Sequence, residues 1–211
     1  MRQRLLTVLV GTLLLVTFTG SSRAQQPPTF ETRKVADNVY IFRYVGHQSM
    51  FVVTQDGVIA TDPISPAAAK VYVEEIKKVT AAPIRYVIYS HHHLDHIAGG
   101  APFKQAGAVF VAHRLAKERL AAIKNPDTVL PDVVVDDAGG VITLGGTRLE
   151  LHYVGRNHSD NTLVMLLPKE RVLFAVDFLP IREILFGVST TRTSTSGSHR
   201  STGCSSSSGT G

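Results

Sequence analysis

Cysteine and tryptophan are the scarcest residues of this 211-residue chain, which has one cysteine, Cys204, and no tryptophan. A single cysteine has no partner within the chain, so the protein has to fold without disulfides. The length permits this, because 211 residues can form one domain with a sizeable core, or part of a larger one. We therefore expect an apolar core to hold the structure together.

The middle of the chain has no excess of positive or negative side chains. The formal net charge is +5, but five of the 22 basic residues lie in the first 24 and last 24 residues, where no acidic residue occurs. The 17 basic side chains between residues 25 and 187 are matched by 17 acidic ones. No basic patch argues for nucleic acid, and a small-molecule substrate is the expected partner.

The first 24 residues resemble a secretory signal peptide. Arg2 and Arg4 precede an apolar run over residues 5–18, and Ser22-Arg23-Ala24 resembles a cleavage site. The run has about 14 apolar positions, fewer than the ~20 that a membrane-spanning helix needs. We therefore predict a signal peptide over residues 1–24, a periplasmic or secreted protein, and no stable membrane anchor after cleavage.

The last 24 residues contain almost no apolar side chains. Serine, threonine and glycine account for 19 of them. Such a composition cannot bury enough apolar surface to offset the entropy lost on ordering, so residues 188–211 are predicted to be a disordered tail. The abrupt change near Gly187 favours a coding sequence that ends there and continues in a different or shifted frame. A natural linker or a cloning remnant is the alternative.

Between these ends, residues 25–34 are predicted to be a linker and residues 35–187 a single domain. Strand-forming runs dominate the domain, with a hairpin turn at Asp56-Gly57 and two outer helices that begin at Pro66 and at Arg114. This order favours an α+β sandwich of sheets with helical flanks. The predicted strands are 39–45, 50–54, 58–61, 84–89, 108–112, 133–135, 141–144, 148–154, 163–167 and 172–176.

The densest group of polar donors follows the predicted strand 84–89 and reads Ser-His-His-His-Leu-Asp-His over residues 90–96. Imidazoles and a carboxylate this close together are costly to bury without a cation. In an extended segment His91, His93 and Asp95 would share one face, with His96 turned towards a second centre. Imidazole and carboxylate suit zinc, with iron or manganese possible at the second centre.

The spacing His-x-His-x-Asp-His resembles the signature of the metallo-β-lactamase superfamily. The resemblance extends from about residue 35 to residue 179. Residues 155–161 resemble the family segment with the next metal-binding histidine, and residues 172–177 resemble the strand that ends in a bridging aspartate. The resemblance implies an αββα metallo-β-lactamase sandwich, of which the second half is incomplete here.

The resemblance also implies a site for two zinc ions. His91, His93 and His158 would hold one ion, Asp95 and His96 the second, and Asp177 would be shared between them. The family has a later histidine at the second ion, but only His199 follows Asp177 and its surroundings match nothing in the motif, so this site is expected to lack one ligand. Asp62 matches a family position that supports the histidine loop, with a plain Asp-Pro turn as the alternative.

The activity implied is that of a zinc-dependent hydrolase, in which a metal-bound hydroxide attacks the carbonyl of an ester, thioester, lactone or β-lactam. Asp95 is the predicted catalytic residue, which orients the hydroxide and takes up its proton. An aspartate at position 177, where the best-known β-lactamases have cysteine, is more like glyoxalase II and lactonases. A truncated metal-binding fragment without activity and a di-iron or sulfur-redox member of the superfamily are the alternatives.

The remaining histidines are expected to have other roles. His92 points away from its neighbours in an extended loop and is predicted to be a support or surface residue. His113 is expected to cap the helix that follows, and His152 to be a structural strand residue. His47 is expected to be a solvated loop residue, with a place at the pocket mouth as the alternative.

Overall fold

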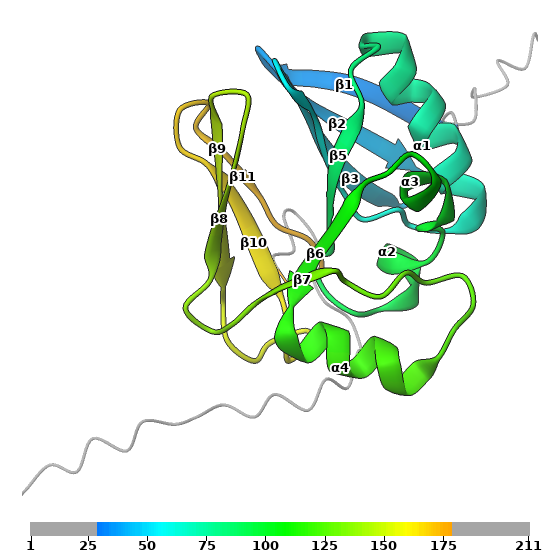
Figure 1. Ribbon diagram of the computed structural model, residues 1–211, viewed down its shortest axis with the longest axis vertical. Coiled ribbons are helices and arrows are strands. Elements are labelled where there is room, and N and C mark those ends of the chain that lie inside the picture. Colours follow the sequence, from blue (N-terminus) through cyan, green and yellow to red (C-terminus); the bar gives the residue numbers. More distant parts are fainter. Residues whose placement is uncertain (1–28, 179–211) are drawn as a thin grey trace, which may run out of the picture.

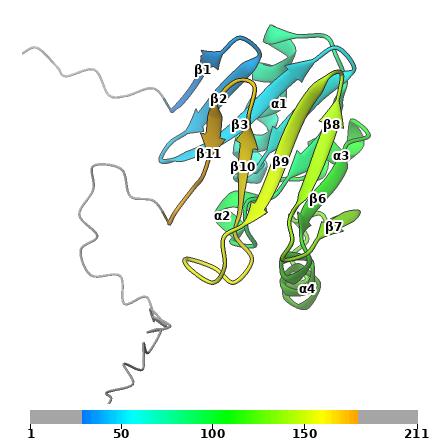
Figure 2. The ribbon, with the colours of Figure 1, turned by 90° about the vertical axis from the view of Figure 1, so that its left-hand side faces the viewer.

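Two β-sheets face each other in the computed structural model, and helices cover the outer face of one of them (Figure 1). The structure describes residues 29–178, so the predicted signal peptide and the predicted tail lie outside the described residues. The described part confirms the predicted α+β arrangement of α, β and β layers. Within residues 29–178 no helix covers the outer face of the second sheet, which faces the viewer in Figure 2.

The larger sheet has seven strands in sequential order. The first four pair antiparallel, and the last four pair parallel, with β4 in both sets. Because β4 and β5 are parallel, their carboxyl ends meet at the same edge of the sheet. The strands are β1 (Phe30–Ala36), β2 (Val39–Tyr44), β3 (His47–Thr54), β4 (Gly57–Thr61), β5 (Ile84–Ile88), β6 (Val109–His113) and β7 (Val133–Val135).

The smaller sheet is antiparallel throughout, in the order β11-β10-β9-β8 (Figure 2). Its strands are β8 (Gly140–Leu144), β9 (Thr147–Tyr153), β10 (Leu163–Leu167) and β11 (Val172–Phe174). The glycine pair that joins β8 to β9 has positive φ at both residues, 51° and 78°, which suits the tight hairpin between these strands.

Four helices occur in the described residues: α1 (Pro66–Val79), α2 (Leu94–Ile97), α3 (Ala101–Gln105) and α4 (Arg114–Ile123). The two longer helices begin where the sequence predicts them. The Ser65 hydroxyl accepts a hydrogen bond from the Ala68 amide at 3.1 Å, and Pro66 occupies the first turn of α1. His113 caps α4, as expected, by accepting from the Leu115 amide. The short helix α2 was not predicted, because four residues are too few for a helical period.

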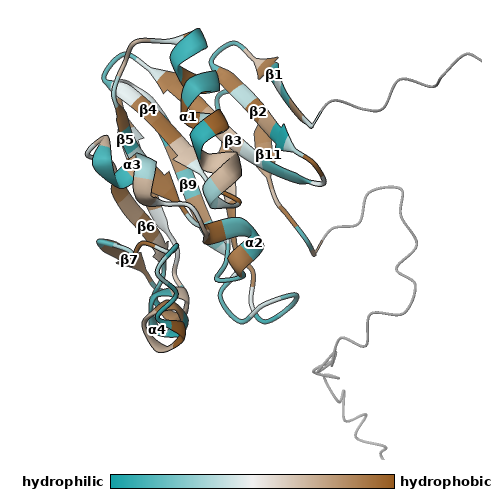
Figure 3. Ribbon diagram, turned by 90° about the vertical axis from the view of Figure 1, so that its right-hand side faces the viewer, coloured by the Kyte–Doolittle hydropathy of each residue, from teal (hydrophilic) through white to brown (hydrophobic). Residues whose placement is uncertain are grey.

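The apolar side chains form two clusters, one on each face of the larger sheet. Beneath the helices, Tyr72 of α1 stacks on Phe42 with ring centroids 4.5 Å apart, and its hydroxyl donates to the Met50 carbonyl at 2.7 Å. Between the sheets, Ile59 and Ile88 pack with side chains such as Met165. Fully burying one such side chain stabilises the fold by roughly 1.5–3 kcal/mol. Figure 3 shows mostly apolar strands behind an α1 with both polar and apolar residues.

The amino-terminal end of the larger sheet corrects one prediction. The linker predicted for residues 25–34 is wrong for its last five residues, because β1 begins at Phe30 and pairs antiparallel with β2, with Phe30 opposite Tyr44. Most residues of β1 are exposed, so their sequence lacks the apolar pattern of an inner strand.

Among the described residues, no helix has an apolar stretch long enough to cross a membrane.

Candidate metal centre

The predicted metal ligands meet at one edge of the sandwich. The turn after β5 and the following α2 contribute the His91–His96 segment, and the loop between β9 and β10 contributes His158. Asp177 follows β11, and Asp62 follows β4. All six predicted ligands thus lie in one neighbourhood, although 86 positions separate the first from the last in the sequence.

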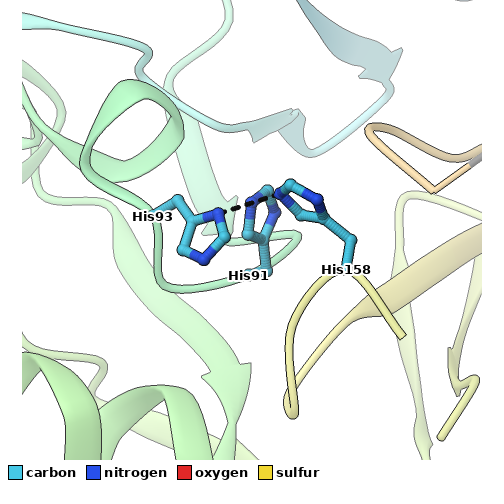
Figure 4. A group of neighbouring side chains, drawn as sticks. All are labelled: His91, His93 and His158. Carbon is cyan, nitrogen blue, oxygen red and sulfur yellow. Dashed lines mark hydrogen bonds between the residues drawn. The ribbon is translucent and has the colours of Figure 1, made fainter. Parts of the chain in front are cut away.

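His91, His93 and His158 form the first set of donors, here termed the imidazole group (Figure 4). One ligand atom from each residue lies within 4.8 Å of the other two. His158 Nε2 and His93 Nδ1 are 2.9 Å apart, drawn as the dashed line in Figure 4. Both nitrogens therefore point towards the same small volume.

The ring of His91 is held on its Nδ1 side, away from the other donors. Its side chain is fully buried, and its Nδ1 lies 3.0 Å from the Ser90 hydroxyl. This contact leaves Nε2 free to face the other donors, and Nε2 is buried without a hydrogen-bond partner in the described structure. A buried imidazole nitrogen held in this way is typical of a metal ligand, because a second contact on the ring orients it.

Asp95 and His96 belong to a second set of donors, together with His47. We refer to His47, Asp95 and His96 as the mixed group, because it combines a carboxylate with imidazoles. One ligand atom of each lies within 4.8 Å of the others, and Asp95 Oδ2 is 3.1 Å from His47 Nε2. His96 is nearly fully buried, whereas the Asp95 side chain is 58% exposed. The mixed group therefore opens towards solvent.

One oxygen atom connects the two groups. Asp177 Oδ2 lies 2.8 Å from His96 Nε2, and 3.4 Å from the Nε2 atoms of both His91 and His158. The 2.8 Å contact is not aligned as a hydrogen bond, so both ring nitrogens of His96 are buried without a hydrogen-bond partner in the described residues. Asp177 has a φ of 68°, a left-handed conformation that is unusual for aspartate and aims this carboxylate.

The local backbone corrects one detail of the sequence prediction. The segment is not extended through Asp95, because His93 is the N-cap of α2 and the chain turns helical at Leu94. Asp95 therefore shares the mixed group with His96 rather than a face with His91 and His93. The rings of His91 and His96 have centroids only 4.5 Å apart, so His96 is not turned away from the first histidines.

Asp62 supports the histidine loop, as the sequence predicts. It is fully buried at the end of β4, and its Oδ1 accepts a hydrogen bond from the Ser90 amide at 2.7 Å. Its Oδ2 lies 3.4 Å from Nδ1 of His96. Asp62 thus holds the backbone before His91 and faces the far side of the His96 ring, which leaves Nε2 of that ring for Asp177 or a cation.

Asn161 joins the two loops that carry the imidazole group, a role that the sequence analysis missed. Its Oδ1 accepts from the His92 amide at 3.0 Å, and its Nδ2 lies 2.8 Å from His92 Nδ1. The backbone reinforces this junction, because the Leu163 amide donates to the Ser90 carbonyl at 2.7 Å. His92 is therefore a support residue, as predicted. Asn161 lies two residues before β10, and the local sequence gives no signal for this role, since its partner is 69 positions away.

The protonation states of the two groups differ. Burial, together with the nearby His96 and His93, lowers the pKa of His91 to about 3. Burial also acts to lower the pKa of His96, but contacts with Asp177 and Asp62 outweigh it and raise that pKa to about 10. Burial acts to raise the pKa of Asp177, and His96 brings it down to about 2. Without a metal, His96 therefore carries the positive charge that balances these carboxylates.

The residues present fit a bound metal ion. Zinc is usually held by imidazole nitrogens at about 2.0–2.1 Å, which places tetrahedral donors ~3.3 Å apart. The observed separations of 2.9–3.4 Å among His93, His158, His91 and Asp177 are close to that value. Nε2 of His91, and Nε2 of His96 once that ring has lost its proton, are buried nitrogens without a hydrogen-bond partner in residues 29–178, and a cation would satisfy both.

The histidines outside the two groups have other surroundings. His113 is buried, stacks on Tyr153 with ring centroids 4.3 Å apart, and lies 3.2 Å from Asp137. His152 is half exposed on β9 and contacts Glu150 at 3.1 Å. Neither belongs to a metal-binding group in residues 29–178. His47, by contrast, is not the solvated loop residue that was expected, since it contacts Asp95.

Comparison with known proteins identifies relatives of two kinds. The chain is 28% identical over 153 residues to the 2,4-dinitroanisole O-demethylase subunit alpha of Nocardioides sp. (strain JS1661), covering 71% of this chain and 46% of that protein. It is 24% identical over 159 residues to the metallo-beta-lactamase type 2 of Elizabethkingia meningoseptica, covering 71% and 62%. The chain thus spans less than two thirds of the length of these relatives.

Solved structures share the fold. A subclass B3 metallo-beta-lactamase of Bradyrhizobium japonicum superposes with a TM-score of 0.56 at 29% identity, covering 64% of this chain and 56% of that one. A metallo-beta-lactamase from Pontibacter korlensis gives a TM-score of 0.60 at 22% identity, covering 69% and 70%. The family model described as metallo-beta-lactamase superfamily matches residues 43–203, most of the chain. This chain belongs to the metallo-β-lactamase superfamily.

Proposed function

We propose that this chain is a zinc-dependent hydrolase with a two-metal site. The observation that carries the proposal is the position of Asp177, one oxygen of which lies within 3.4 Å of histidine nitrogens from both groups. A carboxylate oxygen shared in this way suits two cations side by side. His91, His93 and His158 would hold one zinc ion, Asp95 and His96 the other, and Asp177 both.

Bound zinc would supply Lewis-acid polarisation of a substrate oxygen and activation of a water molecule. The chain's own residues prepare the site for that chemistry. Burial acts to raise the pKa of Asp95, but the His47 hydrogen bond and the nearby His96 lower it overall, so Asp95 is ionised at neutral pH. As an exposed carboxylate at the open side of the site, Asp95 is placed to orient water and to accept its proton.

The substrate proposed is a small molecule with a carbonyl group, namely an ester, thioester, lactone or β-lactam. The matched charges of residues 25–187 support this choice over nucleic acid. One relative is named as a 2,4-dinitroanisole O-demethylase subunit and another as a metallo-beta-lactamase, so both an aryl methyl ether and a β-lactam belong among the compounds tested. The signal-like pattern of residues 1–24 supports a periplasmic or secreted location.

Metal-loaded full-length protein tested on a substrate panel would decide the proposal. The panel contains a chromogenic β-lactam, a lactone, a thioester, an aryl ester and an aryl methyl ether. We expect turnover of at least one of the four carbonyl substrates, a loss of at least ~100-fold in His93→Ala, and none in His152→Ala, which removes a histidine outside the site. Turnover of the aryl methyl ether alone would contradict the proposed substrate class.

Two further results would count against the proposal. Stoichiometric zinc binding without turnover of any panel member would favour the inactive metal-binding fragment. Iron as the metal that co-purifies with the chain would favour the di-iron or sulfur-redox alternative. Elemental analysis of protein purified without added metal separates these two outcomes.

A further inference from the structure

The mixed group contains a donor that neither the metal motif nor the family pattern assigns. The motif gives the second centre Asp95 and His96, with Asp177 shared. The histidine that completes this centre in the family comes from well after the bridging aspartate, where this sequence has only His199 in unmatched surroundings. In the described residues, His47 lies beside Asp95 and His96.

The β2–β3 turn brings His47 to this position. Val45 has a φ of 54° and is followed by Gly46, so the chain reverses within two residues and His47 pairs with Tyr44 as the first residue of β3. Side chains two apart on a strand share a face, so His47 lies on the same face as Ser49. The Ser49 hydroxyl donates to the Asp62 carbonyl, which places that face against the base of the metal site.

The contacts of His47 are with metal-ligand candidates. Its Nε2 is 3.1 Å from Asp95 Oδ2, and its ring lies edge-on to the His96 ring with centroids 5.5 Å apart. Ligand atoms of all three residues lie within 4.8 Å of one another. Nε2 of His96 is buried and has no hydrogen-bond partner in the described part of the chain, so this nitrogen is available to a cation once the ring has lost its proton.

The size and charge of this cluster suit a divalent cation. Asp95 and Asp177 supply two carboxylates, and His47 and His96 supply two imidazoles, which is a donor set that zinc accepts. The His47 side chain is 36% exposed, so it can move the short distance needed to close on an ion without disturbing the core.

We propose that His47 is a ligand of the second metal ion and, with Asp95, His96 and Asp177, completes this centre from the amino-terminal half of the chain. The inference rests on the proposed zinc-dependent function and adds to it a further ligand of the second ion. The second centre is then assembled within residues 47–177, from the β2–β3 turn, α2 and the end of β11.

Zinc titration of the full-length chain tests this inference. The protein is stripped with a chelator, and its affinity for Zn²⁺ alone is measured in competition with a chromophoric chelator, with stoichiometry from elemental analysis. We expect two Zn²⁺ per chain in the unchanged protein. In His47→Ala the first affinity should stay the same and the second should fall at least ~10-fold, since even indirect partners of a metal contribute 10–100-fold.

His47→Gln distinguishes ligation from support. A glutamine amide can still donate a hydrogen bond to Asp95, but it is a poor zinc ligand. If His47 ligates the ion, His47→Gln should resemble His47→Ala, and Co²⁺ bound at the second centre should show a changed visible spectrum. His152→Ala, a half-exposed histidine on β9, is the matched control and should bind both ions as the unchanged protein does.

Three results would overturn the inference. A second affinity in His47→Gln equal to that of the unchanged protein would show that His47 only orients Asp95. A single Zn²⁺ per chain in the unchanged protein, with hydrolytic turnover, would remove the second centre and the two-metal form of the proposed function, but would leave zinc-dependent hydrolysis standing. Absence of zinc binding in every variant would overturn both.

Discussion

The imidazole group and the mixed group share Asp177 but are held by the chain in different ways. The imidazole group is fixed from behind by Ser90 and Asn161, and the pKa values of His91 and His93 are lowered mainly by burial. The mixed group is open to solvent at Asp95, and its buried member His96 has a pKa raised to about 10. The first group is therefore ready to accept a cation, whereas the second must lose a proton to do so.

The largest expected effect comes from removing the residue that the two groups share. Asp177→Asn keeps the shape of the side chain but removes its charge, so both groups lose a donor. We expect the affinity for both zinc ions to fall by at least ~100-fold, beyond what loss of an indirect partner costs. Elemental analysis after dialysis checks this. Two tightly bound ions in the variant would show that Asp177 is not shared.

A change within one group should separate the two centres. His158→Ala removes a donor of the imidazole group and none of the mixed group. We expect loss of the first zinc affinity by roughly 100-fold, with the second changed by less than tenfold. The same titration as for His47→Ala measures it, and the two variants should give opposite patterns. Equal losses at both centres would mean that the groups act as one unit.

The pH dependence of zinc binding should also differ between the groups. His96 is protonated below its raised pKa of about 10, and a metal ligand must be neutral, so zinc binding to the mixed group releases a proton at pH 7. The affinity of the mixed group for zinc should rise by about tenfold per pH unit from roughly pH 7 towards pH 10 and then level off. His91 and His93 have lowered pKa values and release none. Calorimetry in buffers of different ionisation enthalpy measures the protons released.

The smallest effect is expected from the support of the imidazole group. Asn161→Ala leaves the half-buried His92 amide without its acceptor and removes the side-chain link between the loop of His158 and that of His91. We expect the free energy of unfolding to fall by about 1–3 kcal/mol and the first zinc affinity by ~10-fold. Urea denaturation of the metal-free protein measures the former, with Asn38→Ala on the β1–β2 turn as the control. An unchanged affinity for the first zinc ion would show that the Asn161 contacts stabilise the fold but do not position the imidazole group.

Local sequence was enough for most elements of the fold. The hairpin at Asp56-Gly57, the caps of α1 and α4, and the order of the strands follow from turn chemistry and from the period of apolar residues. The same reasoning failed where the period is short or absent. The sequence predicts a linker where the exposed strand β1 begins at Phe30, and an extended loop where the four-residue helix α2 forms.

The sequence by itself determined which residues are donors. The His-x-His-x-Asp-His spacing, His158 and Asp177 carry the family pattern without reference to any contact. The family resemblance also implies how they divide between two ions, and only the tertiary structure decided the contacts behind that division and the addition of His47. The helical turn at Leu94 assigns Asp95 to the mixed group, Asp62 and Asp177 keep a proton on His96, and the β2–β3 turn adds His47 across 48 positions. Such pairings depend on which loops meet at one sheet edge, and that is set by long-range strand pairing rather than by any local pattern.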